Sequence, residues 1–217
     1  MENVAVLDYG GSNLRSVAKA LEFVARGNHQ ITVSSDADEI LSADRIVFPG
    51  QGAIGDCMQS LSRYALIDAI IEGIKTRPFL GICLGLQSLM ATSDEDGGTR
   101  CLNIFDGNVS HFRRDAGPDE NGSPRKIPHM GWNEVEWQKS HPIISGIPSR
   151  SRFYFVHSYF VEPAQRQVVM GETQYIDRFV SALASDNAFA TQFHPEKSAD
   201  AGLQLLENFL RWDGAAA

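Results

Sequence analysis

The 217-residue sequence has few cysteines, no long hydrophobic run and fewer basic than acidic residues. Its three cysteines are an odd number without paired spacing, which argues against a disulfide framework and fits a reducing cytoplasm. No apolar run approaches the length of a membrane span. Because the segment from Met1 to Leu7 has no basic region and leads directly into a strand pattern, we expect no signal peptide and no contact with a membrane.

Basic residues are outnumbered, with 19 Lys and Arg against 27 Asp and Glu, and the net charge is −8. Proteins that follow a phosphate backbone need clustered Lys and Arg, so nucleic acid is not an expected partner. The length fits one large α/β domain with a complete core. We expect this single domain to span residues 1–213, followed by a frayed tail at 214–217.

The first half of the chain alternates strand and helix patterns. Val4 to Leu7 is an unbroken apolar run, typical of a strand buried on both faces of a parallel sheet. A helix capped by Ser12 or Asn13 and ended by Gly27 should follow. Its apolar residues recur at helical spacing: Leu14, Val17, Leu21 and Val24. Further strands are expected at 31–33, 45–48 and 78–82, and further helices at 38–41 and 66–74. This order predicts the α/β class, with an open, mostly parallel sheet flanked by helices and ligands at the carboxyl ends of its strands.

The second half is richer in short β patterns separated by turn residues. Strands are expected at 109–112, 133–137, 153–160, 168–172, 179–184 and 188–193. They suggest antiparallel hairpins added to the sheet. The segment 113–126 is rich in Gly, Pro and charge and predicts an exposed loop. A final helix is expected at 202–212, and its inner face should carry Leu203, Leu206, Phe209 and Leu210.

Cys83 stands where an apolar run ends and a helical pattern begins, with Gly81 and Gly85 two residues to either side. This layout is typical of a nucleophile elbow, a tight strand-to-helix turn that holds a side chain clear of the backbone. The following helix points its free N–H groups at the sulfur and favours the thiolate. Cys57 and Cys101 lack such flanking glycines and are interpreted as small buried residues, with Cys57 in a helix.

A thiolate nucleophile needs a base that also delivers a proton to the leaving group. His194 is the candidate, because Glu196 follows it across Pro195 and both side chains face the same way on an extended segment. The other histidines lack an acid at this spacing and are expected to be surface or packing residues: His29, His111, His129, His141 and His157.

The attack also creates an oxyanion, which requires preorganised N–H donors near the sulfur. The turn Gly50-Gln51-Gly52 ends another predicted strand and could form one wall of an oxyanion hole, with the N–H of Leu84 as the other donor. Gln87 lies one turn after Cys83 and would reach over the same pocket. We expect no metal and no cofactor at this site.

The segments 81–87 (GICLGLQ) and 192–196 (QFHPE) together resemble the class I, or triad, glutamine amidotransferases. Three further segments are similar to those of one branch, the glutaminase subunits of imidazole glycerol phosphate synthases: 7–16, 126–133 and 153–159. The resemblance covers nearly the whole chain and implies a flavodoxin-like α/β fold. The sequence departs from the family pattern at Gly11, Ser12 and Gln51.

The resemblance implies that Cys83 forms a glutamyl thioester, with His194 as acid and base and Glu196 as its orienting group. Glutamine would be held by Gly50, Gly52, Gln87 and the backbone of Ser158 and Tyr159. Ammonia would pass to a (β/α)₈ cyclase subunit, which makes imidazole glycerol phosphate and an aminoimidazole carboxamide ribotide. The residues expected to meet this partner are Asn13, Met130, Gly131, Trp132, Asn133 and Lys197.

Three alternatives are less consistent with the sequence. An α/β-hydrolase-like cysteine hydrolase would carry its acid and its histidine on separate loops. The glutaminase of an anthranilate or aminodeoxychorismate synthase is disfavoured by the segment 128–133 (PHMGWN). A catalytically silent binding homologue would have lost the thiol or its base, whereas all three positions are occupied here.

Overall fold

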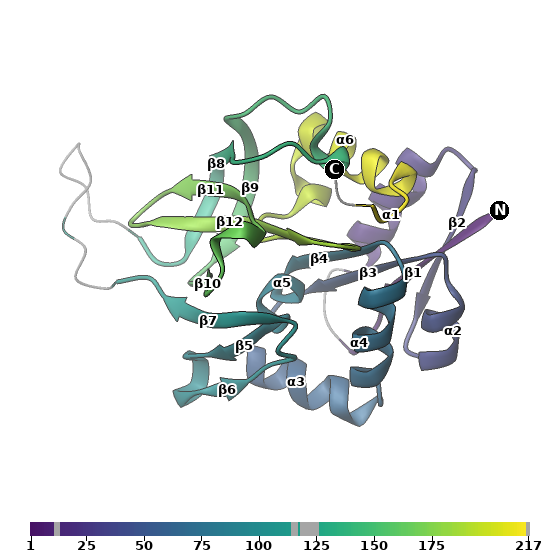
Figure 1. Ribbon diagram of the computed structural model, residues 1–217, viewed down its shortest axis with the longest axis horizontal. Helices are drawn as coiled ribbons and strands as arrows, with labels where there is room; N and C mark the ends of the chain where they lie inside the picture. The colour runs from purple at the N-terminus through teal and green to yellow at the C-terminus, as the bar shows by residue number, and fades with distance from the viewer. Residues whose placement is uncertain (11–13, 114–116, 118–125, 216–217) are drawn as a thin grey trace.

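The computed structural model describes residues 1–10, 14–113, 117 and 126–215 (Figure 1). The predicted cap at Ser12 or Asn13, most of the predicted loop at 113–126 and the end of the predicted tail lie outside these ranges. The first half contains β1 (Glu2–Leu7), α1 (Leu14–Ala25), β2 (His29–Ser34), α2 (Ala37–Ser42), β3 (Arg45–Gly50), α3 (Ile54–Arg63), α4 (Ile67–Thr76), β4 (Phe79–Cys83) and α5 (Leu84–Ser88). The strand and helix alternation predicted from the sequence is confirmed.

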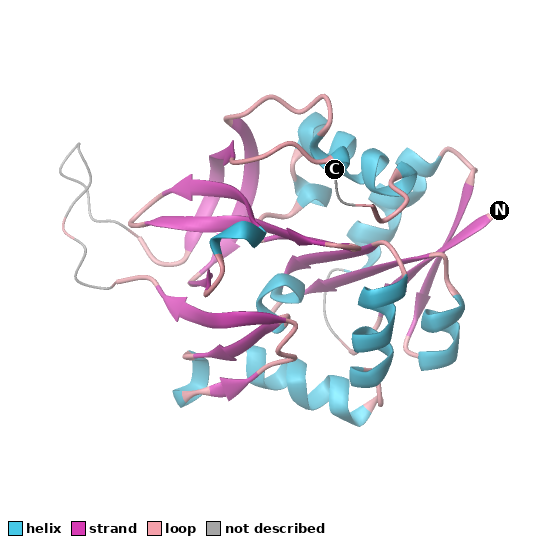
Figure 2. Cartoon of the chain, viewed as in Figure 1, coloured by secondary structure: helices cyan, strands magenta, loops and turns pink. Residues whose placement is uncertain are grey.

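The second half is mostly β-structure, as predicted (Figure 2). Its strands are β5 (Met90–Ser93), β6 (Thr99–Arg100), β7 (Phe105–His111), β8 (His129–Trp137), β9 (Ser151–His157), β10 (Tyr159–Pro163), β11 (Val169–Gln174), β12 (Arg178–Ser185) and β13 (Ala188–Thr191). The chain then enters α6 (Ala199–Arg211), which begins three residues earlier than the predicted helix at 202–212. On its inner face Leu206, Phe209 and Leu210 are buried, and Leu203 is partly buried.

The strands form one twisted sheet in the order β2-β1-β3-β4-β13-β12-β10-β7-β5-β6, with β11, β8 and β9 branching from β12. Strands β2, β1, β3, β4 and β13 run parallel. Antiparallel pairing begins at β12 and continues to β10 and β7. The mixed sheet therefore has the predicted parallel core and added antiparallel strands.

Helices cover both faces of the parallel part of the sheet. The side chains of β1 point alternately to the two faces and are apolar on both. Val4 and Val6 pack with α1 and α6 on one face, and Ala5 and Leu7 pack with α2, α3 and α4 on the other. Figure 1 shows α1 and α6 on one side of the sheet and the other long helices on the opposite side. A strand segment buried on both faces needs apolar residues at every position, which is the pattern observed from Val4 to Leu7.

One prediction for the second half was wrong, and two short strands were missed. The segment 153–160 is not one strand, because the chain breaks at Ser158 between β9, which pairs with β8, and β10, which pairs with β7 and β12. The short strands β5 and β6 were missed, because they lack the alternation that marks a strand. The break at Ser158 matters for function, since it turns this backbone toward the end of β4.

Candidate active site

Cys83 is the last residue of β4 and has a backbone conformation that L-residues rarely adopt, with φ 54° and ψ −105°. Strain of this kind is typical of a nucleophile elbow, and the predicted tight turn from strand to helix at Cys83 is confirmed. The side chain is buried but retains 7% exposure at the floor of a cavity. By contrast Cys57 is buried in α3, where burial raises the pKa of its thiol to about 11.

The flanking glycines allow α5 to pack closely against the sheet. A Cβ on Gly85 would lie 1.9 Å from the carbonyl oxygen of Phe48 in β3. A Cβ on Gly81 would lie 3.1 Å from the Cβ of Ala190 in β13. Their small size therefore lets the elbow contact both neighbouring strands.

His194 and Glu196 form a buried pair next to Cys83. The Nδ1 atom of His194 lies 2.9 Å from Oε1 of Glu196, and the two side chains are 2% and 0% exposed. The two side chains lie together, as the prediction that they face the same way requires, but the predicted extended backbone through Glu196 was wrong. Residues Pro195–Lys197 form a 3₁₀ turn, which brings the carboxylate under the imidazole.

The charge state of His194 follows from its neighbours. Burial disfavours the imidazolium, but the Cys83 sulfur and the Glu196 carboxylate outweigh burial and raise the pKa of His194 to about 10. At neutral pH the histidine is therefore protonated. A protonated imidazole beside a sulfur favours the thiolate and can later give its proton to a leaving group.

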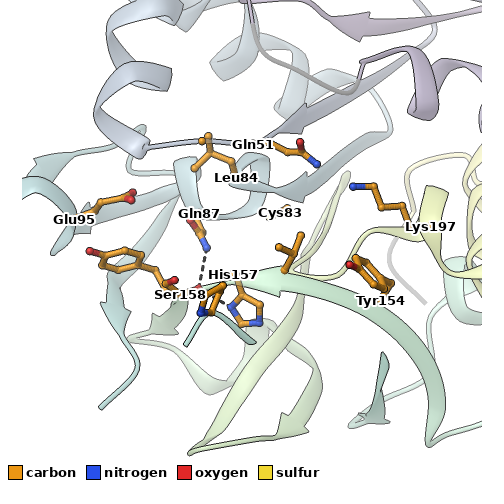
Figure 3. Close-up of a pocket in the computed structure, with 13 residues that line it drawn as sticks. Gln51, Cys83, Leu84, Gln87, Glu95, Tyr154, His157, Ser158 and Lys197 are labelled. Carbon is orange, nitrogen blue, oxygen red and sulfur yellow. Dashed lines mark hydrogen bonds between the residues drawn. The ribbon is translucent and has the colours of Figure 1, made fainter. Parts of the chain in front are cut away.

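A cavity of about 410 Å³ opens in front of the Cys83 sulfur (Figure 3). Its lining includes eight of the residues predicted from the sequence: Gln51, Gly52, Cys83, Leu84, Gln87, Ser158, Tyr159 and Lys197. Gly50 and the pair His194 and Glu196 line a narrower hollow, which shares Gln51 with the cavity. The substrate-facing part of the predicted site is thus brought together from β3, α5 and the break between β9 and β10.

The glycine turn after β3 lies directly beside the elbow, because Gly50 pairs with Cys83 in the sheet register. A Cβ on Gly50 would lie 2.3 Å from the hydroxyl oxygen of Tyr9 and 2.8 Å from the Cβ of Leu84. Burial raises the pKa of the Tyr9 hydroxyl, and the nearby backbone of Gln51 partly offsets this effect. The turn is therefore packed against Tyr9 on one side and against the elbow on the other.

Two glutamine side chains connect the elbow to the opposite wall. Gln87 donates from Nε2 to the carbonyl oxygen of Tyr159 at 3.0 Å and to Oε1 of Gln192 at 3.1 Å. Gln192 in turn donates from Nε2 to the Cys83 sulfur at 3.6 Å. Sequence reasoning placed Gln87 over the pocket but did not assign a role to Gln192. The sequence feature that could have indicated a role for Gln192 is its position two residues before His194.

Glu95 is a cavity residue that sequence reasoning missed. It lies at one end of the cavity, while Tyr154 and Lys197 lie at the other end, with Cys83 and Gln87 between them (Figure 3). Its carboxylate accepts the N–H of Ile54 at 2.9 Å, and burial raises its pKa. No local motif marks this residue, because 94–96 is an acidic segment of ordinary appearance. Only the fold brings it to the cavity.

The residues predicted to meet a partner lie mainly on β8. Met130 and Trp132 are 62% and 44% exposed, which is unusual for large apolar side chains. Gly131 between them has φ +132°. Asn133 points its amide inward, donating to the backbone oxygen of Gln174 and to Nε2 of His129. Lys197 lines the cavity, and Asn13 lies outside the described residues.

Among the described residues there is no group of three or more His, Cys, Asp or Glu side chains that could hold a metal ion. None of the helices within the described ranges is long and apolar enough to cross a membrane.

The chain was compared with known families, curated proteins and solved structures. Residues 5–212 match the model of the family described as glutamine amidotransferase class-I. The imidazole glycerol phosphate synthase subunit HisH of Hydrogenovibrio crunogenus is 52% identical over 212 residues, covering 97% of each chain. The protein of the same name from Nitrosococcus oceani is 51% identical over 216 residues, covering 100% of each chain.

The fold also resembles a solved structure. A glutamine amidotransferase from Thermotoga maritima aligns with a TM-score of 0.63 and 16% sequence identity, covering 97% of this chain and 95% of that chain. At this identity the likeness supports the fold alone. It agrees with a mostly parallel sheet flanked by helices.

Proposed function

The chain belongs to the class-I glutamine amidotransferase family, and we propose that it is the glutaminase subunit of an imidazole glycerol phosphate synthase. It hydrolyses L-glutamine to glutamate and ammonia, and it delivers the ammonia to a cyclase subunit. The cyclase makes imidazole glycerol phosphate and an aminoimidazole carboxamide ribotide for histidine biosynthesis. The relatives named above support this assignment because they match the chain over nearly its full length.

The observation that carries the proposal is the strained Cys83 at the floor of a cavity, backed by the buried pair His194 and Glu196. The Cys83 sulfur attacks the side-chain carboxamide carbon of glutamine. His194 gives its proton to the departing nitrogen, so ammonia leaves and a thioester remains. A water molecule then loses a proton to His194 and attacks the thioester, which releases glutamate and restores the thiolate.

The negative oxygen formed during each attack needs N–H donors that are already in place. We assign this role to the N–H of Leu84 and to the turn Gly50-Gln51-Gly52. These residues support the assignment because the turn pairs with Cys83 in the sheet and reaches the cavity at Gln51 and Gly52. Tyr9 packs against this turn, because a Cβ on Gly50 would lie 2.3 Å from its hydroxyl oxygen.

The cavity also offers groups that fit the amino-acid end of glutamine. The Glu95 carboxylate suits the α-ammonium group of glutamine. A hydrogen bond between two charged groups is stronger than one between neutral groups. Both N–H bonds of the Gln87 amide are used by Tyr159 and Gln192, which leaves its Oε1 as an acceptor for the same ammonium. The backbone of Ser158 and Tyr159 closes the opposite wall.

We propose that the cyclase docks on the face that carries Met130 and Trp132. An exposed Met and Trp two residues apart suit a protein interface, where aromatic residues and Met are enriched. Gly131, Asn133, Lys197 and Asn13 are assigned to the same interface. We further propose that residues 1–213 form one amidotransferase domain and that the protein acts in the cytoplasm.

The decisive experiment measures glutamate release by the chain alone and mixed with a cyclase subunit and its nucleotide ligand. We expect low activity alone and a clear increase in the complex. The matched variant is Cys83→Ala, which should abolish glutamine-dependent synthesis and leave ammonia-dependent synthesis by the complex intact. Full glutaminase activity without any response to the cyclase would contradict the coupling, and loss of both syntheses would point to failed assembly.

A further inference from the structure

Gln192 is a fully buried polar residue whose side chain contacts the reacting sulfur. It follows β13 and precedes the 3₁₀ turn of His194 and Glu196, and its exposure is 0%. Its backbone N–H donates to the carbonyl oxygen of Ser181 in β12 at 2.9 Å, so the main chain is fixed. Its amide nitrogen Nε2 lies 3.6 Å from the Cys83 sulfur. Burying an amide is costly unless both of its ends are hydrogen-bonded.

The orientation of the Gln192 amide is set by a chain of contacts that ends on a backbone carbonyl. The carbonyl oxygen of Tyr159 can only accept, so the side-chain group of Gln87 that faces it must be the NH₂ group. That same NH₂ group faces Gln192, so the atom it meets must be the carbonyl oxygen Oε1. The other end of the Gln192 amide is therefore the N–H donor, and it faces the Cys83 sulfur.

The Tyr159 carbonyl is itself held in place by a second donor. It accepts from Nδ1 of His157 at 2.8 Å, and Nε2 of His157 lies 3.0 Å from Nδ1 of His129. Burial lowers the pKa of His157 to about 3 and that of His129 to about 4, so both rings are neutral. His157 therefore donates from Nδ1 to the carbonyl oxygen of Tyr159, and His129 donates from Nδ1 to Nε2 of His157. The Tyr159 carbonyl, where this series of contacts starts, is thus a fixed acceptor.

We propose that Gln192 is a catalytic residue that donates a hydrogen bond to the Cys83 sulfur and thereby stabilises the thiolate before it attacks the carboxamide. This inference rests on the proposed glutaminase function and adds a second donor beside His194. A thiolate is a better hydrogen-bond acceptor than a thiol, so a fixed N–H donor favours the charged form. Because Gln192 is neutral at every working pH, it holds the sulfur even after His194 has given up its proton.

The test uses the full chain and three variants. Gln192→Met removes the donor with little change in volume. Gln192→Glu also removes the donor but keeps an oxygen for Gln87, so it covers the case in which the Met variant does not fold. The matched control is Thr191→Val, because Thr191 is equally buried but its hydroxyl donates to the carbonyl oxygen of Phe193 and does not contact the sulfur.

The measurement is the rate of alkylation of Cys83 by iodoacetamide as a function of pH, with the modified peptide identified by mass spectrometry. Loss of one hydrogen bond to a charged acceptor should raise the midpoint of this profile by about one pH unit in Gln192→Met. Gln192→Glu should raise it further, since a carboxylate next to the sulfur repels the thiolate. The Thr191→Val profile should match that of the unmodified chain. A purely structural role for Gln192 would lower the unfolding midpoint and leave the alkylation profile unchanged.

The outcomes separate this inference from the proposed function. If the unmodified complex hydrolyses glutamine but both Gln192 variants keep its alkylation midpoint, the role of Gln192 is overturned and the function stands. If both variants shift the midpoint but the unmodified complex releases no glutamate, the thiolate contact stands and the function fails. A shift of equal size in Thr191→Val also overturns the inference, because the effect would then come from disturbed packing.

Discussion

Replacing Glu196 by Gln tests whether the carboxylate orients and charges His194. The substitution keeps the size of the side chain and removes its negative charge. In the structure Oε1 of Glu196 lies 2.9 Å from Nδ1 of His194, and the Glu196 side chain is 0% exposed. Water therefore cannot solvate the imidazolium in place of the lost carboxylate, and the substitution should directly reduce the stability of protonated His194.

The magnitude follows from the difference between a charge-assisted and a neutral hydrogen bond. The first is worth roughly 1.5–3 kcal/mol and the second roughly 0.5–1.5 kcal/mol, so neutralising Glu196 costs about 1–2 kcal/mol of imidazolium stabilisation. This lowers the pKa of His194 by about one unit and the rate by roughly five- to thirtyfold, since about 1.4 kcal/mol corresponds to a factor of ten. If the new amide turns its NH₂ group toward Nδ1, the imidazole carries its proton on the wrong nitrogen. An asparagine in the corresponding position of a serine protease triad lowers kcat by about 10⁴.

The assay is glutamate release by the complex with the cyclase subunit across a range of pH. We expect kcat to fall roughly fivefold or more while KM for glutamine stays within about a factor of two, because Glu196 does not line the cavity. The control is Glu207→Gln, which makes the same chemical change on α6, where Glu207 pairs with exposed Arg211. A surface pair contributes about 0–1 kcal/mol, so this variant should keep full activity. A loss smaller than about threefold in Glu196→Gln would refute the orienting role.

Three other perturbations have expected outcomes. Gly85→Ala places a Cβ 1.9 Å from the carbonyl oxygen of Phe48, so we expect a loss of about 3 kcal/mol or more in urea unfolding. Gly55→Ala, in a helix with its nearest contact at 3.4 Å, should instead be neutral or stabilising; equal losses would contradict this reasoning. Glu95→Gln should raise KM for glutamine roughly tenfold or more and leave kcat nearly unchanged, and an unchanged KM would exclude Glu95 from substrate binding. Stability should be greatest near neutral pH. Above the unfolded value of about 6.5 it should fall as pH rises toward the raised pKa of His194, because only the folded state keeps that proton. Below about 6.5 it should fall by about 1.4 kcal/mol per pH unit for each buried neutral histidine, and unfolding that is independent of pH between about 4 and 7 would contradict this account for His129, His141 and His157.

The first half of the fold could be predicted because its elements are local. An apolar run such as Val4 to Leu7 and a helical period such as that of α1 each contain their own signal. The fold of the second half depends on which strands pair, and the pairing partners are distant from one another in the sequence. The segment 153–160 has continuous β character, yet it divides at Ser158 because β9 and β10 have different partners. No property of the segment itself indicates that break.

The proposed nucleophile and its proposed base could be located in the sequence for a related reason. The elbow around Cys83 and the spacing of His194 and Glu196 are short motifs whose chemistry depends on neighbours in sequence. Glu95 was missed because its role depends on the path of the loop after β5, which brings it to the cavity. Its sequence neighbourhood is that of an ordinary acidic loop.

The environment of the sulfur depends on the longest-range contacts in the site. Gln192 lies 109 residues from Cys83, and Gln87 reaches Tyr159 over 72 residues. Each contact requires the parallel pairing of β13 with β4 and the break before β10 to be correct to a single residue, because a shift of one residue in a strand turns its side chains to the other face. The short motif around Cys83 therefore indicates the proposed nucleophile, whereas the sheet register determines which groups lie next to its sulfur. Substitutions that disturb the register between β13 and β4 should impair the thiol even though they do not contact it.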